Sequence, residues 1–190
     1  MIPFGKVDMG TIWTVGHSNR EVGEFLGLLG AHGVEVVADV RRFPGSRRQP
    51  WFGGEALAGS LRGAGIGYRH FAGLGGRRGG TTAGSPNAGW RVGAFNAFAD
   101  HMGSEAFRAD LEALEALGRE RRVAVMCSEA VPWRCHRRLI ADALVVGGWS
   151  VLDIVGPAAP KEHGLTPFAR VEGGRLVYPA EGPAGGDGPA

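Results

Sequence analysis

The sequence predicts an α/β fold: a single three-layer domain with a mainly parallel sheet of about five strands, followed by a small C-terminal hairpin. Short apolar, β-branched runs alternate with longer stretches of helical periodicity along most of the chain. Such alternation favours a parallel sheet with helices on both faces. The length of 190 residues suits one domain, and 44% hydrophobic residues are enough to fill a core.

The first third of the chain is expected to form three strands and two helices. The three strands are expected at 11–15, 34–40 and 66–69. Ser18 and Glu21 have capping-box spacing, which predicts that the first helix starts there and ends near Gly33. A second helix is expected over 55–64, and the residues before it form a long loop rich in Arg, Pro and Gly.

The rest of the chain continues the alternation after a long Gly-rich loop over 70–89. Helices are expected at 92–101, after the cap Ser104 and at 134–146, and strands at 122–127 and 149–155. The hairpin is expected within 169–178. We therefore divide the chain into an α/β domain (11–156), a C-terminal extension with the hairpin (157–179) and a flexible, low-complexity tail (180–190).

Composition limits the classes of function. No apolar run approaches the roughly 18 residues that a membrane span needs, and the N-terminus lacks a secretory pattern. We therefore expect a cytoplasmic protein with reduced thiols and no membrane partner. The net charge of +2 does not demand a polyanion partner. Only Lys6 and Lys161 are Lys, so 19 of the 21 basic residues are Arg. We attribute this total to codon composition and consider anion binding, which the planar guanidinium suits, only for particular arginines.

Polar side chains follow four of the five predicted strands. In chain order they are His17 and Ser18; Asp39, Arg41 and Arg42; Tyr68 and His70; and Cys127, Ser128 and Glu129. In an open parallel sheet, ligands bind beyond the carboxyl ends of the strands. The pattern predicts one site at that edge.

The segment from Cys127 to Arg137 lies between a strand and a helix, and three interpretations of it stay open. Cys127 can be a thiolate nucleophile, activated by the helix N-terminus, with Arg134 and Arg137 as anion holders and Glu129 as acid or base. The spacing Cys-x6-Arg misses the Cys-x5-Arg loop of protein tyrosine phosphatases by one residue.

The second interpretation is a metal site, and the third is purely structural. Cys127, Cys135 and His136 are residue types that bind zinc. Adjacent Cys135 and His136 are expected to point in different directions, so a fourth ligand would come from His17 or His70. Either cysteine can instead simply be buried in the core.

The loop after the second strand offers similar choices. Asp39 can be a catalytic carboxylate or an ion-pair partner that only orders the loop with Arg41. Arg47 and Arg48 are expected to be solvated. No dinucleotide or P-loop motif is present, which argues against an ATPase or an ordinary Rossmann dehydrogenase and leaves any cofactor unknown.

With these residues in view, residues 11–156 resemble the family described as domain of unknown function 488. The resemblance rests on T-V-G-H-S at 14–18, D-V-R-x-x-P-x-S at 39–46, Y-x-H-x-x-x-L-G-G at 68–76 and C-x-E-x5-C-H-R at 127–137. It implies an α/β fold and implies that these motifs are the functional positions. It supplies no reaction.

The leading hypothesis is an enzyme, a hydrolase or transferase, acting on a small anionic substrate that is phosphate- or nucleotide-like. Cys127, Glu129, Asp39 and His17 are the expected catalytic residues. The expected substrate-binding residues are Ser18, Arg41, Arg42, Tyr68, His70, Arg134, His136 and Arg137. The alternatives are a nucleic-acid or nucleotide binding module without catalysis, and a metal site. The sequence does not indicate an oligomeric state.

Overall fold

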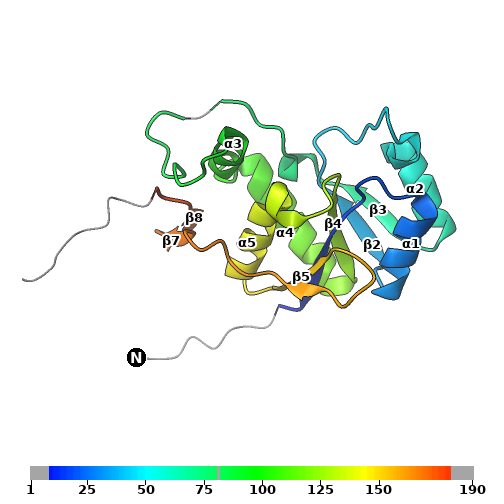
Figure 1. Ribbon diagram of the computed structural model, residues 1–190. Coiled ribbons are helices and arrows are strands. Elements are labelled where there is room, and N and C mark those ends of the chain that lie inside the picture. The colour runs from blue at the N-terminus through cyan, green and yellow to red at the C-terminus, as the bar shows by residue number, and fades with distance from the viewer. Residues whose placement is uncertain (1–8, 81, 181–190) are drawn as a thin grey trace, which may run out of the picture.

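The computed structural model describes residues 9–80 and 82–180, and it confirms the α/β fold (Figure 1). The main sheet is built from β1 (Thr11–Gly16), β2 (Val36–Asp39), β3 (Gly67–His70), β4 (Val123–Cys127), β5 (Ser150–Ile154) and β6 (Lys161–Glu162). The α-helices are α1 (Val22–Ala31), α2 (Gly54–Gly63), α3 (Gly93–His101), α4 (Glu105–Glu120) and α5 (Arg137–Val146). Three short 3-10 helices are η1 (Pro50–Phe52), η2 (Ala72–Leu74) and η3 (Pro132–Arg134). The hairpin pairs β7 (Arg170–Glu172) with β8 (Arg175–Val177).

The strand order in the main sheet is β3-β2-β4-β1-β5-β6. The first five strands run parallel, as expected, and their carboxyl ends meet at one edge. The sixth strand, β6, is antiparallel to β5 and was not predicted. Two exposed, charged residues carry no alternation of apolar and polar side chains, so periodicity cannot reveal such a strand.

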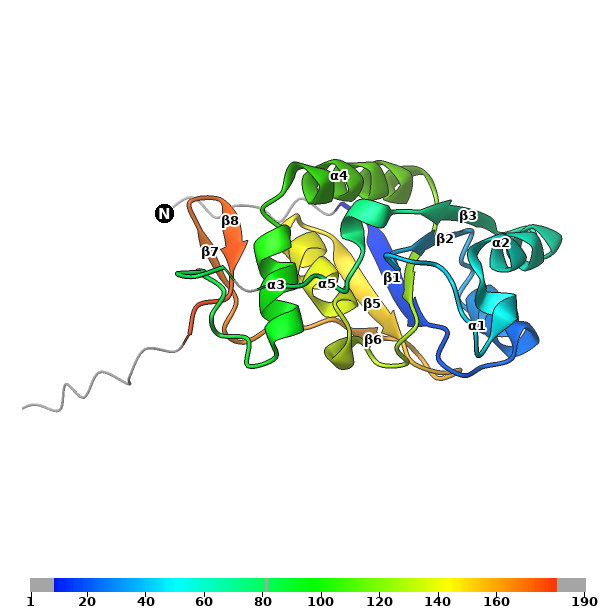
Figure 2. The same cartoon turned by 90° about the horizontal axis from the view of Figure 1, so that it is seen from above.

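Helices cover both faces of the sheet, which gives the expected three layers. Figures 1 and 2 show α1 and α2 on one side of the strands and α3, α4 and α5 on the other. Alternate residues of β4 enter the two cores: Val123 and Val125 pack with α3, α4 and α5, whereas Ala124 and Met126 pack with α1 and α2. The central strands β1, β2 and β4 are therefore buried on both faces, which explains their largely apolar sequences.

The two predicted helix caps had different outcomes. Ser104 caps α4, since its hydroxyl accepts a hydrogen bond from the backbone N–H of Phe107 at 3.2 Å. The capping box at Ser18 is wrong: α1 starts after Glu21 with no side-chain cap, and Ser18 has a left-handed φ of 51°. The Ser18 hydroxyl instead donates to the side chain of Asn19. Ser18 lies in the turn that follows β1, where contacts with other elements determine the backbone conformation.

The last helix before β5 begins later than predicted. The expected helix over 134–146 is divided into η3, an extended residue at Cys135 and then α5. Pro132 at the start of η3 fixes the backbone of this short turn. The division matters because it places Cys135 and His136 outside the regular helix.

The C-terminal extension is part of the core. Asp142 of α5 accepts hydrogen bonds from the hydroxyls of Thr166 (2.6 Å) and Tyr178 (2.9 Å). His163 bridges Asp142 and Asp153 at 3.0 and 3.1 Å. The predicted flexible tail lies outside the described residues except for Ala180. In the part of the chain that the structure describes, no helix is long and apolar enough to cross a membrane.

Candidate functional site

A cavity of about 910 Å³ opens at the carboxyl edge of the sheet. The predicted site residues that line it are His17, Ser18, Arg41, Arg42, Cys127, Glu129, Arg134 and His136. The structure therefore brings together eight of the twelve candidates. Four others do not line the cavity: Asp39, Tyr68, His70 and Arg137. The first three surround Arg41, and the fourth lies beneath the strand ends.

Two cysteines and a histidine converge in this cavity. The Nδ1 atom of His136 is 3.6 Å from Sγ of Cys135 and 4.0 Å from Sγ of Cys127. The other ring nitrogen, Nε2, is 3.0 Å from the carbonyl oxygen of Val40 and must carry a proton to donate to it. This bond assigns a proton to Nε2, so Nδ1 is the ring nitrogen that faces the two sulfurs.

The two thiols differ in acidity although both are buried. The pKa of Cys127 lies well below its ordinary value, because Cys135 donates a hydrogen bond to it, and His136 and the charge of Arg137 add to this effect against the cost of burial. The pKa of Cys135 is raised, because it is the donor to Cys127 and because it is buried. Cys127 is thus the more acidic sulfur of the pair, and Cys135 is the donor to it.

The same three side chains have the spacing of metal ligands. Their ligand atoms all lie within 4.8 Å of one another. Tetrahedral zinc with bonds of about 2.3 Å to sulfur and about 2.0 Å to nitrogen places sulfur and nitrogen about 3.6 Å apart. The expectation that Cys135 and His136 point apart is therefore wrong, because Cys135 is extended rather than helical. Neither His17 nor His70 belongs to this group among the described residues.

A buried network holds Arg41 at the wall of the cavity. Asp39 is fully buried, and its Oδ2 accepts from the Arg41 guanidinium at 2.5 Å and from the Tyr68 hydroxyl at 2.8 Å. Its Oδ1 accepts from the backbone and Nε of Arg41. His70 donates through Nε2 to the Arg41 carbonyl oxygen at 2.7 Å. Both carboxylate oxygens of Asp39 thus orient Arg41, and Asp39 does not line the cavity.

His17 is buried beside this network. Its ring stacks on Phe52 with centroids 4.1 Å apart, and Nδ1 donates to the Ser18 carbonyl oxygen at 2.9 Å. The guanidinium of Arg41 approaches Nε2 at 3.4 Å. Burial lowers the pKa of His17, and the charge of Arg41 lowers it further against the hydrogen bond to Ser18. The ring is neutral at pH 7.

Arg137 organises the backbone under the site. Its guanidinium is fully buried and donates to the carbonyl oxygens of Val15 at 2.5 Å and Glu129 at 3.2 Å. It therefore faces backbone rather than the cavity, where an anion holder was expected. The backbone under the site also packs closely at Gly16, because a Cβ there would lie 1.7 Å from the Glu129 carbonyl oxygen.

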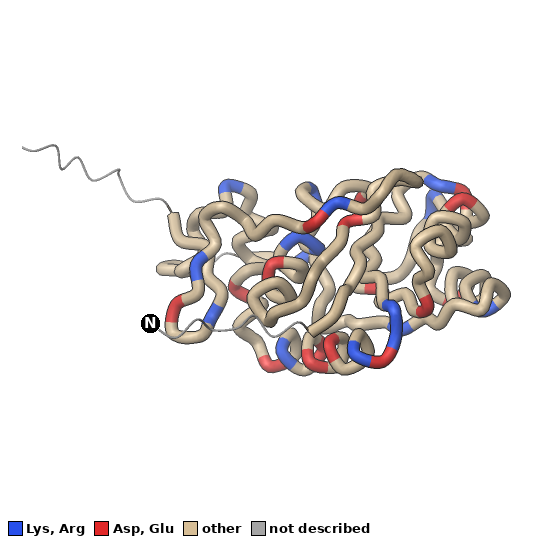
Figure 3. The backbone as a smooth tube through the Cα atoms, turned by 90° about the horizontal axis from the view of Figure 1, so that it is seen from below, with Lys and Arg blue, Asp and Glu red and all other residues tan. Residues whose placement is uncertain are grey.

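The cavity is locally basic. Six arginines line it, against Glu129 as the only acidic lining residue; the arginines are Arg41, Arg42, Arg47, Arg48, Arg77 and Arg134. Arg47 and Arg48 are exposed, as expected, but they lie at the cavity rather than on an unrelated surface. Elsewhere basic and acidic residues are interspersed along the backbone (Figure 3). The positive charge is therefore concentrated at this site.

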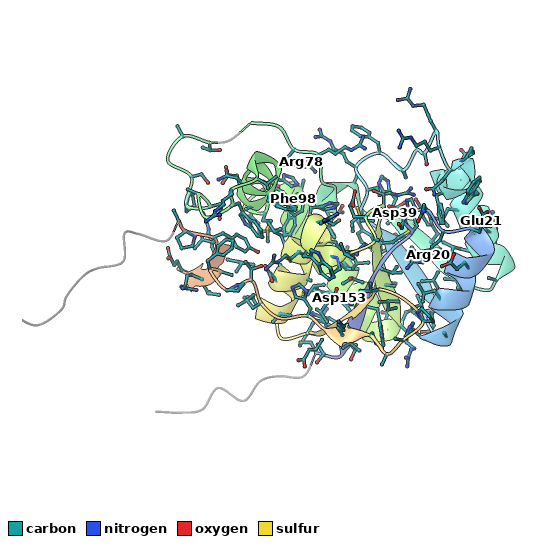
Figure 4. The ribbon with its side chains drawn as sticks, viewed as in Figure 1. Arg20, Glu21, Asp39, Arg78, Phe98 and Asp153 are labelled. Atoms are coloured by element: carbon teal, nitrogen blue, oxygen red, sulfur yellow. The ribbon has the colours of Figure 1, made fainter. Side chains whose placement is uncertain are left out.

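Sequence reasoning missed the contribution of α3. Ala94, Phe95 and Phe98 of this helix form one wall, and Phe98 packs on the His136 ring with centroids 4.9 Å apart. Figure 4 labels Phe98 near α3 and Asp39 towards the other half of the molecule. The strand-end rule cannot find this wall, because α3 follows the long Gly-rich loop rather than a strand. Its aromatic residues were consistent with a simple core face.

Comparisons with known proteins identify the family. A family model described as "Domain of unknown function DUF488" matches residues 21–144, which is more than half of the chain. No curated protein and no solved structure matches the chain. The matched range contains Asp39, Arg41, Cys127, Glu129 and the Cys135–Arg137 segment. The chain therefore belongs to the DUF488 family.

Proposed function

We propose that the protein is a thiol-dependent enzyme that acts on a small anionic substrate, with Cys127 as the nucleophile. The observation that carries this proposal is the placement of a polarised Cys127–Cys135–His136 group in a cavity lined by six arginines. Cys127 is the thiolate because Cys135 and His136 stabilise its charge. A cavity of about 910 Å³ is large enough for a nucleotide-sized ligand.

The side chains divide into those that meet the substrate and those that position them. Arg41, Arg42 and Arg134 bind the anionic group, since guanidinium forks match phosphate and carboxylate oxygens. Asp39 positions Arg41, which is the role that its buried contacts favour over direct catalysis. Arg137 likewise positions the Glu129 loop.

The chemistry is nucleophilic substitution in two steps. The Cys127 sulfur forms a bond to the electrophilic atom of the substrate, and the bond to the leaving group breaks. The leaving group takes up a proton from solvent, relayed by the Glu129 carboxyl group at the cavity. Water or an acceptor then loses its proton to Glu129 and displaces the sulfur, which gives hydrolysis or transfer.

The alkylation rate of each cysteine as a function of pH tests the thiolate. With iodoacetamide and peptide mass spectrometry on the folded protein, Cys127 is expected to react with an apparent pKa well below about 8.5, and Cys135 is not. Pyrophosphate in the cavity should slow the reaction of Cys127. The Cys135→Ala variant is the matched control, because it removes the hydrogen-bond donor to Cys127 and should raise the apparent pKa of Cys127.

Two results would contradict the proposal. One is a Cys127 that stays unreactive in the folded protein up to pH 9. The other is a stoichiometric metal ion in protein purified without tag or chelator, because a coordinated thiolate is not a free nucleophile. In that case Cys127, Cys135 and His136 are the residues to test as ligands. Once a substrate is found by screening phosphoesters and nucleotides, Cys127→Ser should abolish turnover.

A further inference from the structure

We propose that Cys127 and Cys135 act together as a redox dithiol that reduces anionic disulfides, with Cys127 as the attacking sulfur and Cys135 as the resolving sulfur. This inference rests on the proposed function, since it uses the same thiolate. It goes further because it assigns a role to Cys135 and names a class of substrate: disulfides whose substituents bear carboxylates or phosphates.

The first argument is the distance between the sulfurs. Both Sγ atoms belong to a group in which no two ligand atoms are more than 4.8 Å apart, and both cysteines line the cavity. A disulfide bond requires the sulfurs to approach to about 2.05 Å. Cys135 lies in the extended linker between η3 and α5. A change at one linker residue, rather than in a strand or helix, can therefore close this gap.

The second argument is that the two sulfurs differ in protonation: Cys135 is the hydrogen-bond donor and Cys127 is the acceptor. A dithiol reductant needs one ionised sulfur to attack and one protonated sulfur that ionises later. Cys127 receives the hydrogen bond and Cys135 donates it. The Nδ1 of His136 is 3.6 Å from the Cys135 sulfur, so it is placed to accept the Cys135 proton when that thiol attacks.

The reaction balances without any other oxidant. The Cys127 thiolate attacks one sulfur of the substrate R–S–S–R′, which forms a mixed disulfide and releases R′–S⁻. Cys135 passes its proton to His136 and attacks the Cys127 sulfur, which forms the Cys127–Cys135 disulfide and releases R–S⁻. The substrate gains two electrons and the dithiol loses two, and the His136 proton protonates a released thiolate.

The third argument is the charge of the cavity around the sulfurs. Arg134 immediately precedes Cys135 and lines the cavity with five other arginines, against Glu129 alone. Electrostatic steering into such a site raises association rates by factors of about 10–10³. The site therefore favours disulfides that carry negative charge over those that carry positive charge.

Mass spectrometry of samples quenched at successive times tests this proposal. Glutathione disulfide is the anionic probe, and cystamine is the cationic probe. Wild-type protein is expected to lose two hydrogens as the internal disulfide forms. Cys135→Ser should instead retain a mixed disulfide on Cys127, and Cys127→Ser should form neither product.

We expect glutathione disulfide to react at least about tenfold faster than cystamine. Arg134→Gln should reduce that ratio, whereas Arg62→Gln, an exposed arginine of α2 outside the cavity, should not.

The outcomes separate this inference from the proposed function. Suppose Cys127 is reactive at low pH in the alkylation experiment but wild-type protein keeps the mixed disulfide as long as Cys135→Ser does. Then Cys135 is not a resolving thiol, and the dithiol role is wrong while the nucleophile stands. Equal rates for the two probes would overturn the assigned substrate class. Circular dichroism of each variant shows whether a negative result reflects unfolding instead.

Discussion

At the scale of single residues, the site depends on a buried ion pair. Asp39 and Arg41 are both buried, and Asp39 holds the guanidinium by its Nε and Nη2 atoms. The third nitrogen, Nη1, donates to the Phe52 carbonyl oxygen at 2.8 Å. These contacts hold the Arg41 guanidinium in one orientation, which would preorganise it for the anion binding that we propose.

Replacing Asp39 with Asn should destabilise the fold and weaken anion binding together. The variant leaves the Arg41 charge buried without its partner, and breaking a buried pair costs about 3–5 kcal/mol. Urea denaturation measures the loss. Glu24→Gln is the matched control, because it removes the exposed carboxylate that lies 3.2 Å from Nε of Arg20, a pair worth less than about 1 kcal/mol. Equal losses in the two variants would contradict this account.

At the scale of elements, the end of β1 and the loop after β4 are locked together. The N–H groups of His17 and Ser18 donate to the carbonyl oxygens of Cys127 and Ser128 at 3.0 and 2.9 Å. Gly16 lies where the Glu129 backbone passes over the strand. The position of Cys127 and Glu129 therefore depends on a residue that has no side chain.

Gly16→Ala should displace the Glu129 loop and lower both stability and the reactivity of Cys127. Its Cβ would lie 1.7 Å from the Glu129 carbonyl oxygen, so backbone must move. Gly59→Ala in α2 is the control, since nothing lies within 4 Å of its Cβ and the helix should gain about 0.5–1 kcal/mol. Thermal unfolding and the alkylation rate measure both effects. A Gly16→Ala protein that matches the wild type in both would show that the loop is free to move.

The stability of the junction between α5, β5 and the C-terminal extension should depend on pH, because His163 titrates there. Burial acts to lower the pKa of His163, but its bonds to Asp142 and Asp153 and their charges outweigh this and raise it to about 9. The folded pKa exceeds the unfolded value of about 6.5, so this stabilisation is complete below pH 6.5 and is lost as pH rises through 9.

We therefore expect the free energy of unfolding to fall between about pH 7 and 9.5 by an amount on the order of 2 kcal/mol. The measurement is urea denaturation at several pH values in this range. His163→Gln cannot titrate, so the difference between the two proteins isolates the contribution of His163 from that of other groups. Parallel pH profiles for wild type and variant would show that His163 does not carry this dependence.

At the scale of the whole molecule, a net charge of +2 conceals a strongly basic cavity. Anion binding there should weaken as salt screens the arginines. Protection of Cys127 by pyrophosphate is expected to decrease severalfold when NaCl rises from about 50 to about 500 mM. Protection that does not change with salt would argue against electrostatic binding. The same titration with single-stranded nucleic acid tests the alternative of a nucleic-acid partner, whose affinity should have a steep salt dependence.

Much of this architecture follows from the sequence because its causes are local. Strand and helix periods, the Ser104 cap and the run of polar residues after four strands need no knowledge of distant contacts. They predicted the three layers and the edge of the sheet where the cavity lies. The parallel strands made the prediction of a shared site possible, because all their carboxyl ends meet at one edge.

Only the tertiary structure decided which residues face the cavity and which stand behind it. Asp39 and Arg137 are charged residues at strand and helix ends like Arg41. Asp39 pairs with Arg41 two residues away, but Tyr68, which donates to Asp39, and Val15, which accepts from Arg137, come from segments far along the chain. The wall formed by α3 and the convergence of Cys135 and His136 with Cys127 also depend on such long-range packing. Sequence periodicity shows which residues share a face of the same helix or strand. Contacts across the sheet edge depend on how all the elements pack together.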